Sequence, residues 1–89
     1  MIKNLYAVRD TVANNIVGGI IMEALDAPAI RAFYDALRAP GNLLSEHPAD
    51  FVLVQLGNID TATGDLREQP VITIATGNGW LEMQKGLQG

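Results

Sequence analysis

The sequence lacks cysteine and contains a single histidine, His47. Without thiols the chain cannot form disulfides, thiolate metal sites or a thiol nucleophile. His47 stands before Pro48 in a turn with Ser45 two residues earlier, so it has no second imidazole for a metal site and no third group to orient a nucleophile and base. We therefore expect no catalytic residue, no metal and no cofactor, and a protein that binds a partner instead of catalysing a reaction.

Charge is also scarce, because charged residues make up only 18% of the chain. Ten acidic against six basic residues give a net charge of -4, and such a field repels nucleic acid and anionic membranes unless basic residues gather locally. No segment reaches the ~20 apolar residues of a membrane helix, and the N-terminus lacks the basic start of a signal peptide. We expect a cytoplasmic protein with no membrane partner.

Apolar residues, in contrast, make up 48% of the 89 residues. A chain of this length forms one domain, here residues 1–89, and so small a domain with so few charges to cover its surface favours self-association. We expect a homodimer or a larger homo-oligomer. The apolar strands predicted at Phe51–Ile59 and Ile16–Leu25 are the candidate subunit interfaces.

Period-two patterns and turn residues predict five strands and thus an α+β fold with a small antiparallel or mixed sheet. A hairpin is expected at the start of the chain, with a bulge, a bend or the close approach of another backbone at Gly18-Gly19. Pro70 is expected to divide the last two strands. The Phe51–Ile59 run is nearly all apolar, as in a strand covered on both faces or lying at an interface. The predicted strands are Lys3–Arg9, Ile16–Leu25, Phe51–Ile59, Leu66–Gln69 and Val71–Ala75.

One main helix is expected to cover this sheet. Asp26-Ala27-Pro28 predicts its start, with the Asp26 side chain accepting hydrogen bonds from first-turn amides, and Pro40-Gly41 ends it. An apolar stripe repeats at helical spacing over Ile30, Phe33, Tyr34 and Leu37. A short amphipathic helix is expected at Trp80–Lys85.

Two loops resemble ligand sites. Asp60 and Asp65 flank a threonine-rich segment, but the alternating oxygen ligands and the terminal glutamate of a calcium loop are missing, so a hairpin with Gly64 in a left-handed conformation is preferred. The second loop, Gly77-Asn78-Gly79, lies between a strand and a helix, where backbone amides bind anions. It lacks the third glycine of a dinucleotide fingerprint and the Lys-Ser/Thr pair of a P-loop, so a structural turn is the alternative.

A basic surface next to exposed aromatic rings would bind single-stranded nucleic acid by charge and stacking. Arg31 and Arg38 are seven residues apart on one helix, and Tyr6 and Trp80 are the candidate stacking residues. The alternative is ordinary solvated charge, with Asp35 neutralising the helix face and the aromatic rings in the core. The candidate nucleic-acid-binding residues are Lys3, Arg9, Arg31, Arg38 and Arg67.

Three consecutive motifs in the middle of the chain carry a family resemblance. They are an Ile-Arg-x-Phe helix at Ile30–Phe33, a Pro-x-Asp-aromatic strand entry at Pro48–Phe51, and a Gly-x-x-Asp-x-x-x-Gly hairpin at Gly57–Gly64. In these motifs the chain resembles the small nonstructural protein of gokushovirus-type microviruses, which are bacteriophages with single-stranded DNA genomes. The Gly18-Gly19 strand and the Trp80 segment match no feature of that family.

The resemblance implies a non-enzymatic protein of the host bacterial cytoplasm. It implies that this protein binds single-stranded DNA and assists viral replication or the switch to single-strand synthesis and packaging, with Arg31 as the one basic residue inside the motifs. The alternative is an adaptor that binds the replication initiator, a host factor or capsid precursors without contacting DNA. A minor structural component of the virus particle is a third option.

Overall fold

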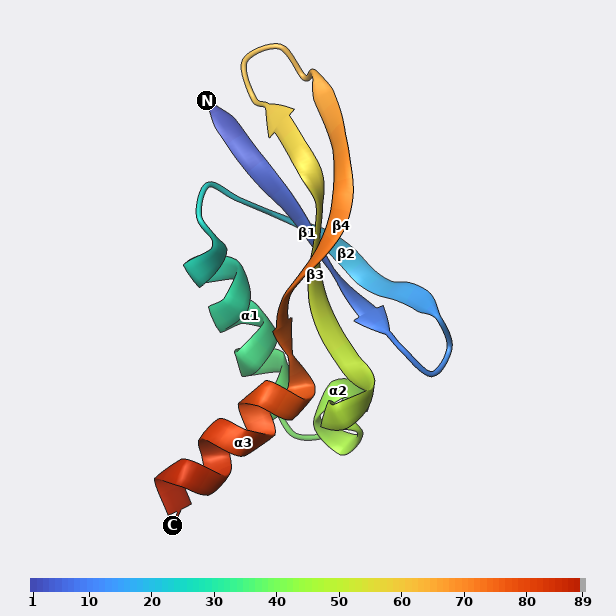
Figure 1. The fold of residues 1–89 in the computed structure, drawn as a ribbon, viewed down its shortest axis with the longest axis vertical. Coiled ribbons are helices and arrows are strands. Elements are labelled where there is room, and N and C mark those ends of the chain that lie inside the picture. Colours follow the sequence, from blue (N-terminus) through green and yellow to red (C-terminus); the bar gives the residue numbers. More distant parts are fainter. Residues whose placement is uncertain (89) are drawn as a thin grey trace.

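The computed structural model describes residues 1–88 as a four-stranded antiparallel sheet with helices, which confirms the α+β prediction. The strands lie in the order β2-β1-β3-β4, so that β1 and β3 are central and β2 and β4 form the two edges. Figure 1 shows the helices gathered around one end of the sheet, with the β3–β4 loop at the other end. The elements are β1 (Ile2–Asp10), β2 (Asn15–Glu23), α1 (Asp26–Arg38), α2 (Leu43–Glu46), η1 (Pro48–Asp50), β3 (Phe51–Asp60), β4 (Leu66–Thr76) and α3 (Gly77–Gln88).

The first two strands form the predicted hairpin. The carboxylate of Asp10 accepts hydrogen bonds from the amides of Val12 (2.9 Å) and Ala13 (3.1 Å), and Asn14 adopts a left-handed conformation with φ 59°. Between the pairs Tyr6–Ile21 and Val8–Val17 the register shifts, which leaves Gly18–Ile20 opposite Ala7. The bulge expected at Gly18-Gly19 is therefore confirmed, and Gly18 has the positive φ (72°) that glycine tolerates best.

The last two predicted strands are in fact one, so the prediction of five strands is wrong. The segment Leu66–Thr76 is a single strand that pairs with β3 on both sides of Pro70. The register shifts between Gln55–Ile72 and Gly57–Glu68, which places Pro70 in a bulge of an edge strand. A proline is tolerated there because its missing N–H removes no hydrogen bond from a regular ladder.

The main helix begins and ends where the sequence predicts, but Asp26 does not cap it. Leu25 is the N-cap residue and makes no side-chain hydrogen bond, whereas Asp26 lies in the first turn. Its carboxylate instead accepts a hydrogen bond from the hydroxyl of Tyr6, a buried residue of β1. The inner side of α1 carries Ala29, Phe33 and Leu37, which are buried at the i, i+4 and i+8 spacing of one helix face.

The two shorter helices differ from the prediction in extent. Asn42 caps α2 through a reciprocal pair of hydrogen bonds with Ser45, and His47 follows as an exposed residue. The C-terminal helix is longer than the expected Trp80–Lys85, because the predicted glycine loop forms its first turn. Among residues 1–88 no helix has the length and apolar character needed to cross a membrane.

The core lies on one side of the sheet, between the strands and α1. Its fully buried side chains come from β1, α1 and β3, and residues of α2, β4 and α3 pack around them. The described chain is extended, with dimensions of 47 × 27 × 23 Å. Its radius of gyration of 13.8 Å exceeds the roughly 12 Å expected for a compact domain of this length. The buried cluster consists of Tyr6, Ala29, Phe33, Leu37, Phe51 and Leu53.

Candidate binding surfaces

The basic residues predicted to bind nucleic acid lie on three separate parts of the molecule. Alternation along β1 places Lys3 and Arg9 on the side of the sheet opposite to buried Tyr6. Arg31 and Arg38 are exposed on α1, and Arg67 lies in β4 near the β3–β4 loop. Within residues 1–88 these five side chains therefore form no common basic patch.

Ion pairs offset the positive charge of two residues in this set, and a hydrogen bond to a neutral side chain occupies a third. Arg38 pairs with Asp35 on α1, and Arg67 Nε lies 3.4 Å from Asp65 Oδ2. Arg9 donates a hydrogen bond to the amide oxygen of Asn14. Exposed ion pairs add at most about 1 kcal/mol of stability each, but their carboxylates screen the charge that would attract a phosphate.

Tyr6 is not available for stacking. Its side chain has no exposed surface, and its hydroxyl accepts a hydrogen bond from Asn4 Nδ2 (3.1 Å) while donating one to Asp26. Burial raises the pKa of the Tyr6 hydroxyl, and the hydrogen bond to the Asp26 carboxylate raises it further. The prediction of Tyr6 as a stacking residue is wrong, because the amphipathic β1 strand turns this ring toward the core.

Trp80 is half-buried and packs against the same core from α3. Its indole nitrogen is buried and has no hydrogen-bond partner among the described residues. A buried donor without an acceptor costs about 1–3 kcal/mol, so the ring is held by apolar packing and not by a specific polar contact. Only part of this ring is open to a ligand.

The glycine loop has a structural explanation. Gly77 lies so close to the carbonyl oxygen of Pro48 that an added Cβ would come within 1.6 Å of it. The Thr76 hydroxyl accepts a hydrogen bond from the Gly79 amide at 2.8 Å. Gly77, Asn78 and Gly79 therefore form the first turn of α3 instead of the predicted loop. Glycine is required at position 77 for close packing of η1 against α3.

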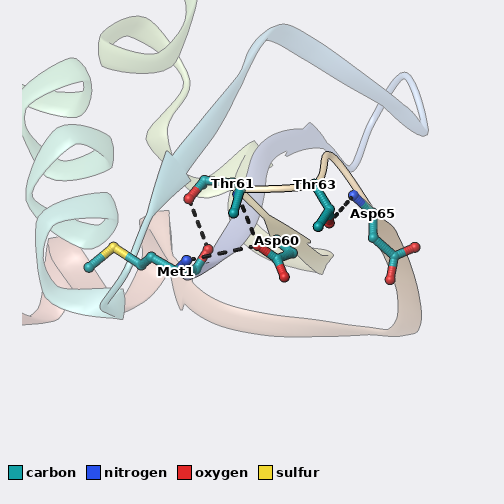
Figure 2. Close-up of polar contacts among 6 residues, drawn as sticks. Met1, Asp60, Thr61, Thr63 and Asp65 are labelled. Carbon is teal, nitrogen blue, oxygen red and sulfur yellow. Dashed lines mark hydrogen bonds and ion pairs between the residues drawn. The ribbon is translucent and has the colours of Figure 1, made fainter.

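The Asp60–Asp65 segment forms the predicted hairpin loop, with Gly64 at φ 78°. Figure 2 shows its hydrogen bonds: the carbonyl oxygen of Met1 accepts from the amide (2.9 Å) and hydroxyl (3.0 Å) of Thr61, and the Asp65 amide donates to Thr63 Oγ1. The Asp60 carboxylate accepts from the Ala62 amide and lies 3.8 Å from the amino group of Met1. The two carboxylates thus have separate partners, and residues 1–88 contain no metal-ligand cluster.

The side of the sheet away from α1 is apolar at its centre. We call it the open face, and it carries Leu5 and Ala7 of β1 paired with Gly57 and Val54 of β3. None of these four residues belongs to the core cluster under α1. Ala7 and Val54 are nevertheless buried. Lys3 and Arg9 lie at the two ends of this face, roughly 20 Å apart along the strand.

An apolar groove opens on the other side, between the β2 bulge, α1 and α2. It has a volume of about 380 Å³, and all its lining residues are apolar or glycine. Gly19, Ala32 and Ala36 leave the space free, because their small side chains stand where larger ones would fill it. An added Cβ at Gly19 would meet nothing within 4 Å. The remaining lining residues are Val8, Val17, Gly18, Ile21, Phe33, Leu43 and Leu44.

Comparison with known protein families shows which family the chain belongs to. The family model described as phage ORF5 protein matches residues 3–79, which include all four strands and α1 apart from the first residue of β1. The chain belongs to the phage ORF5 protein family. No curated protein is similar to it, and no solved structure matches it.

Sequence reasoning missed the groove of this phage protein. Its walls come from residues far apart in the chain, and its only sequence signal is the small size of Gly19, Ala32 and Ala36. The open face was partly foreseen, since the continuous apolar run of Phe51–Ile59 predicted either two covered faces or an interface. The residues 80–88 of α3 lie beyond the segment that the ORF5 family model matches.

Proposed function

We propose that this phage protein is a non-enzymatic adaptor that binds another protein through the groove between β2, α1 and α2. The observation that carries the proposal is the lining of the groove, which contains no charged or hydrogen-bonding side chain. A nucleotide or phosphate needs polar partners to be bound specifically, whereas an apolar side chain of a partner protein needs only a close fit. The groove therefore supports a protein ligand more than a nucleic acid.

Electrostatics indicate the chemistry of the partner. The chain has a net charge of -4, so a protein that presents an apolar side chain on a basic surface is the complementary ligand. The resemblance to microvirus nonstructural proteins supports an accessory role in viral replication or packaging in the host cytoplasm. The phage replication initiator and capsid precursors are the partners to test first.

The test uses variants that fill the groove from two walls. Gly19→Val adds a side chain from β2 where space is open, and Ala36→Leu adds one from α1. Ala27→Leu is the matched control, because Ala27 is exposed on the same helix and does not line the groove. Binding of each purified protein to the initiator and to the capsid protein is measured by biolayer interferometry.

We expect both groove variants to weaken binding at least tenfold, which corresponds to about 1.4 kcal/mol, and Ala27→Leu to bind as the wild type does. Circular dichroism and thermal melting establish that each variant is folded. Equal affinity of all four proteins would exclude the groove as the binding site. If the wild type binds neither partner, the proposal of an adaptor in replication and packaging is wrong.

Single-stranded DNA is the second candidate ligand, supported by the position of Lys3 and Arg9 on one face of the sheet. Fluorescence anisotropy of labelled single-stranded and duplex oligonucleotides, at low and physiological salt, measures this binding directly. If DNA is the ligand, affinity falls as salt rises, and Lys3→Ala and Arg9→Ala each reduce the salt dependence. The groove variants would leave DNA affinity unchanged, so the two functions are distinguished by different residues.

A further inference from the structure

The lining of the groove restricts the backbone conformation of any segment that enters it. An extended segment brings unpaired N–H and C=O groups, and each one that is buried without a partner costs about 1–3 kcal/mol. The side chains of the groove offer no hydrogen-bond partner for these groups. An extended ligand would therefore depend on the backbone of β2, the edge strand that forms one wall of the groove.

β2 does not provide a regular ladder beside the groove. Its pairing with β1 is irregular over Gly18–Ile20, and Gly18 has a φ of 72°. Gly18 and Gly19, which belong to this bulge, also line the groove. Because a bulge bends and twists an edge strand, its outward N–H and C=O groups are poorly placed for pairing with another strand. A helix has no such requirement, since its backbone hydrogen bonds are internal.

The size of the groove indicates how many side chains of the ligand it holds. A cavity of about 150 Å³ with apolar walls holds one benzene ring. The groove has a volume of about 380 Å³, which is room for two large apolar side chains. Two such side chains lie side by side on a helix when they are four residues apart. On the α1 wall Ala32 and Ala36 have no side chain beyond Cβ, which lets a second helix approach α1 closely.

The charges at the borders of the groove favour a basic ligand. Three carboxylates there form no ion pair within residues 1–88. On α1, Arg38 is paired with Asp35, so that Arg31 is the cation that opposes them. Lysine or arginine beside the apolar side chains of the ligand is therefore complementary. The three carboxylates belong to Asp10 and Glu23, which strand alternation places on the groove side of β1 and β2, and to Glu46, one turn after Leu43 in α2.

We propose that the ligand of the groove is an amphipathic helix of the partner protein, with two apolar side chains four residues apart in the groove and basic residues on its flanks. The proposal rests on the adaptor function and names the occupant of the same site. Phenylalanine, leucine or methionine fits the groove better than tyrosine or tryptophan, because no lining side chain accepts a hydrogen bond from a buried hydroxyl or indole N–H.

Three synthetic peptides of about 20 residues, titrated into the isotope-labelled whole chain and followed by NMR, test the proposal. The first is a lysine-rich helical peptide with two phenylalanines four positions apart. The second has a proline between the phenylalanines, which breaks the helix, and the third has glutamate in place of lysine. We expect the first peptide to shift the amides of Gly19, Ala36 and Leu44 and to bind at least tenfold more tightly than the other two.

Variants of the protein show whether the first peptide occupies the groove. Gly19→Val should weaken its binding at least tenfold, and Ala27→Leu should leave it unchanged. Equal affinity of the first two peptides would overturn the helical ligand, and equal affinity of the lysine and glutamate peptides would overturn its basic flanks. No binding of the first peptide at millimolar concentration, or amide shifts only outside the groove, would make the proposal wrong.

Failure of this proposal is distinguishable from failure of the adaptor function, because the interferometry assay uses whole partner proteins. If Gly19→Val weakens binding of the initiator or the capsid protein but the first peptide does not bind, the groove is the adaptor site and its ligand is not a helix. If the first peptide binds the groove but neither partner protein binds the wild type, the groove takes a helix and the partners of the proposed function are wrong.

Discussion

The two edge strands of this sheet have similar compositions and different geometries. Most of β2 and the second half of β4 lie in long segments without charge. β2 has one glycine bulge against β1, whereas β4 has two irregularities against β3, one around Pro70 and one at Ile74, before Gly77 begins α3. Composition alone does not reveal how each edge is protected from pairing with another chain, because protection by a bulge depends on backbone conformation.

The largest effect is expected at the end of β4, where Gly77 packs against Pro48. A Cβ at position 77 would lie 1.6 Å from a backbone carbonyl oxygen, so Gly77→Ala must displace either η1 or α3. We expect a loss of about 3 kcal/mol in the free energy of unfolding, measured by urea denaturation. The control is Gly86→Ala in the same helix, where an added Cβ meets nothing within 4 Å. Equal stability of the two variants would show that β4 is not anchored at Gly77.

The next effect is expected where the chain leaves β2 and enters α1. Tyr6→Phe removes the hydrogen bond that the hydroxyl donates to Asp26, and should cost about 1–2 kcal/mol in urea denaturation. A loss below a few tenths of a kcal/mol would mean that this bond does not hold the connection after β2. Tyr34→Phe is the control, because Tyr34 makes no comparable buried contact with Asp26 among residues 1–88.

Tyr6 also predicts a dependence of stability on pH. Its pKa in the folded protein is raised above the ordinary 10.0, so the unfolded state loses this proton at lower pH than the folded state. The contribution of Tyr6 is therefore complete below pH 10.0 and is lost as pH rises through the folded pKa. Unfolding curves of the wild type should weaken more than those of Tyr6→Phe above that pH. Parallel pH profiles would contradict the raised pKa.

A smaller pair of effects separates the two glycines of the β2 bulge. Gly18→Ala places a side chain at a φ of 72° and should cost about 1–2 kcal/mol. Gly19→Ala has open space and no positive φ, so it should be neutral or stabilise by about 0.5–1 kcal/mol. Thermal melting of the two variants measures the difference. The same loss at both positions would indicate that the bulge is not centred on Gly18.

The smallest effect is expected at Thr76, the last residue of β4. Its hydroxyl accepts a hydrogen bond from the Gly79 amide, so Thr76→Ala should lower stability by about 1 kcal/mol or less. Thr76→Ser retains the hydroxyl and should recover most of the loss in the same melting experiment. Failure of serine to do so would assign the effect to the lost methyl group of threonine and not to the cap.

Much of the fold was predictable because the signals for it are local. Turn residues placed both hairpins, and apolar spacing placed α1 correctly from Asp26 to the Pro40-Gly41 stop. Pro70 was misleading, since a proline in a strand pattern indicates a break and the sheet instead accommodates it at a bulged edge. The two expected short strands are therefore one long strand.

The candidate sites were less predictable than the fold. The basic residues are scattered over β1, α1 and β4, which one-dimensional spacing did not reveal, and Tyr6 is buried where a stacking role was expected. The groove combines residues from β1, β2, α1 and α2, so no single motif marks it.

By itself the sequence determined the α+β class, the two hairpins, the main helix and the absence of thiol chemistry, because these depend on residue type and short-range spacing. Only the tertiary structure decided that α1 covers one face of the sheet, that Gly77 is required by the contact with Pro48, and that β4 is one long edge strand. Those features depend on which segments meet in space, and burial and close contact between distant residues leave almost no local pattern.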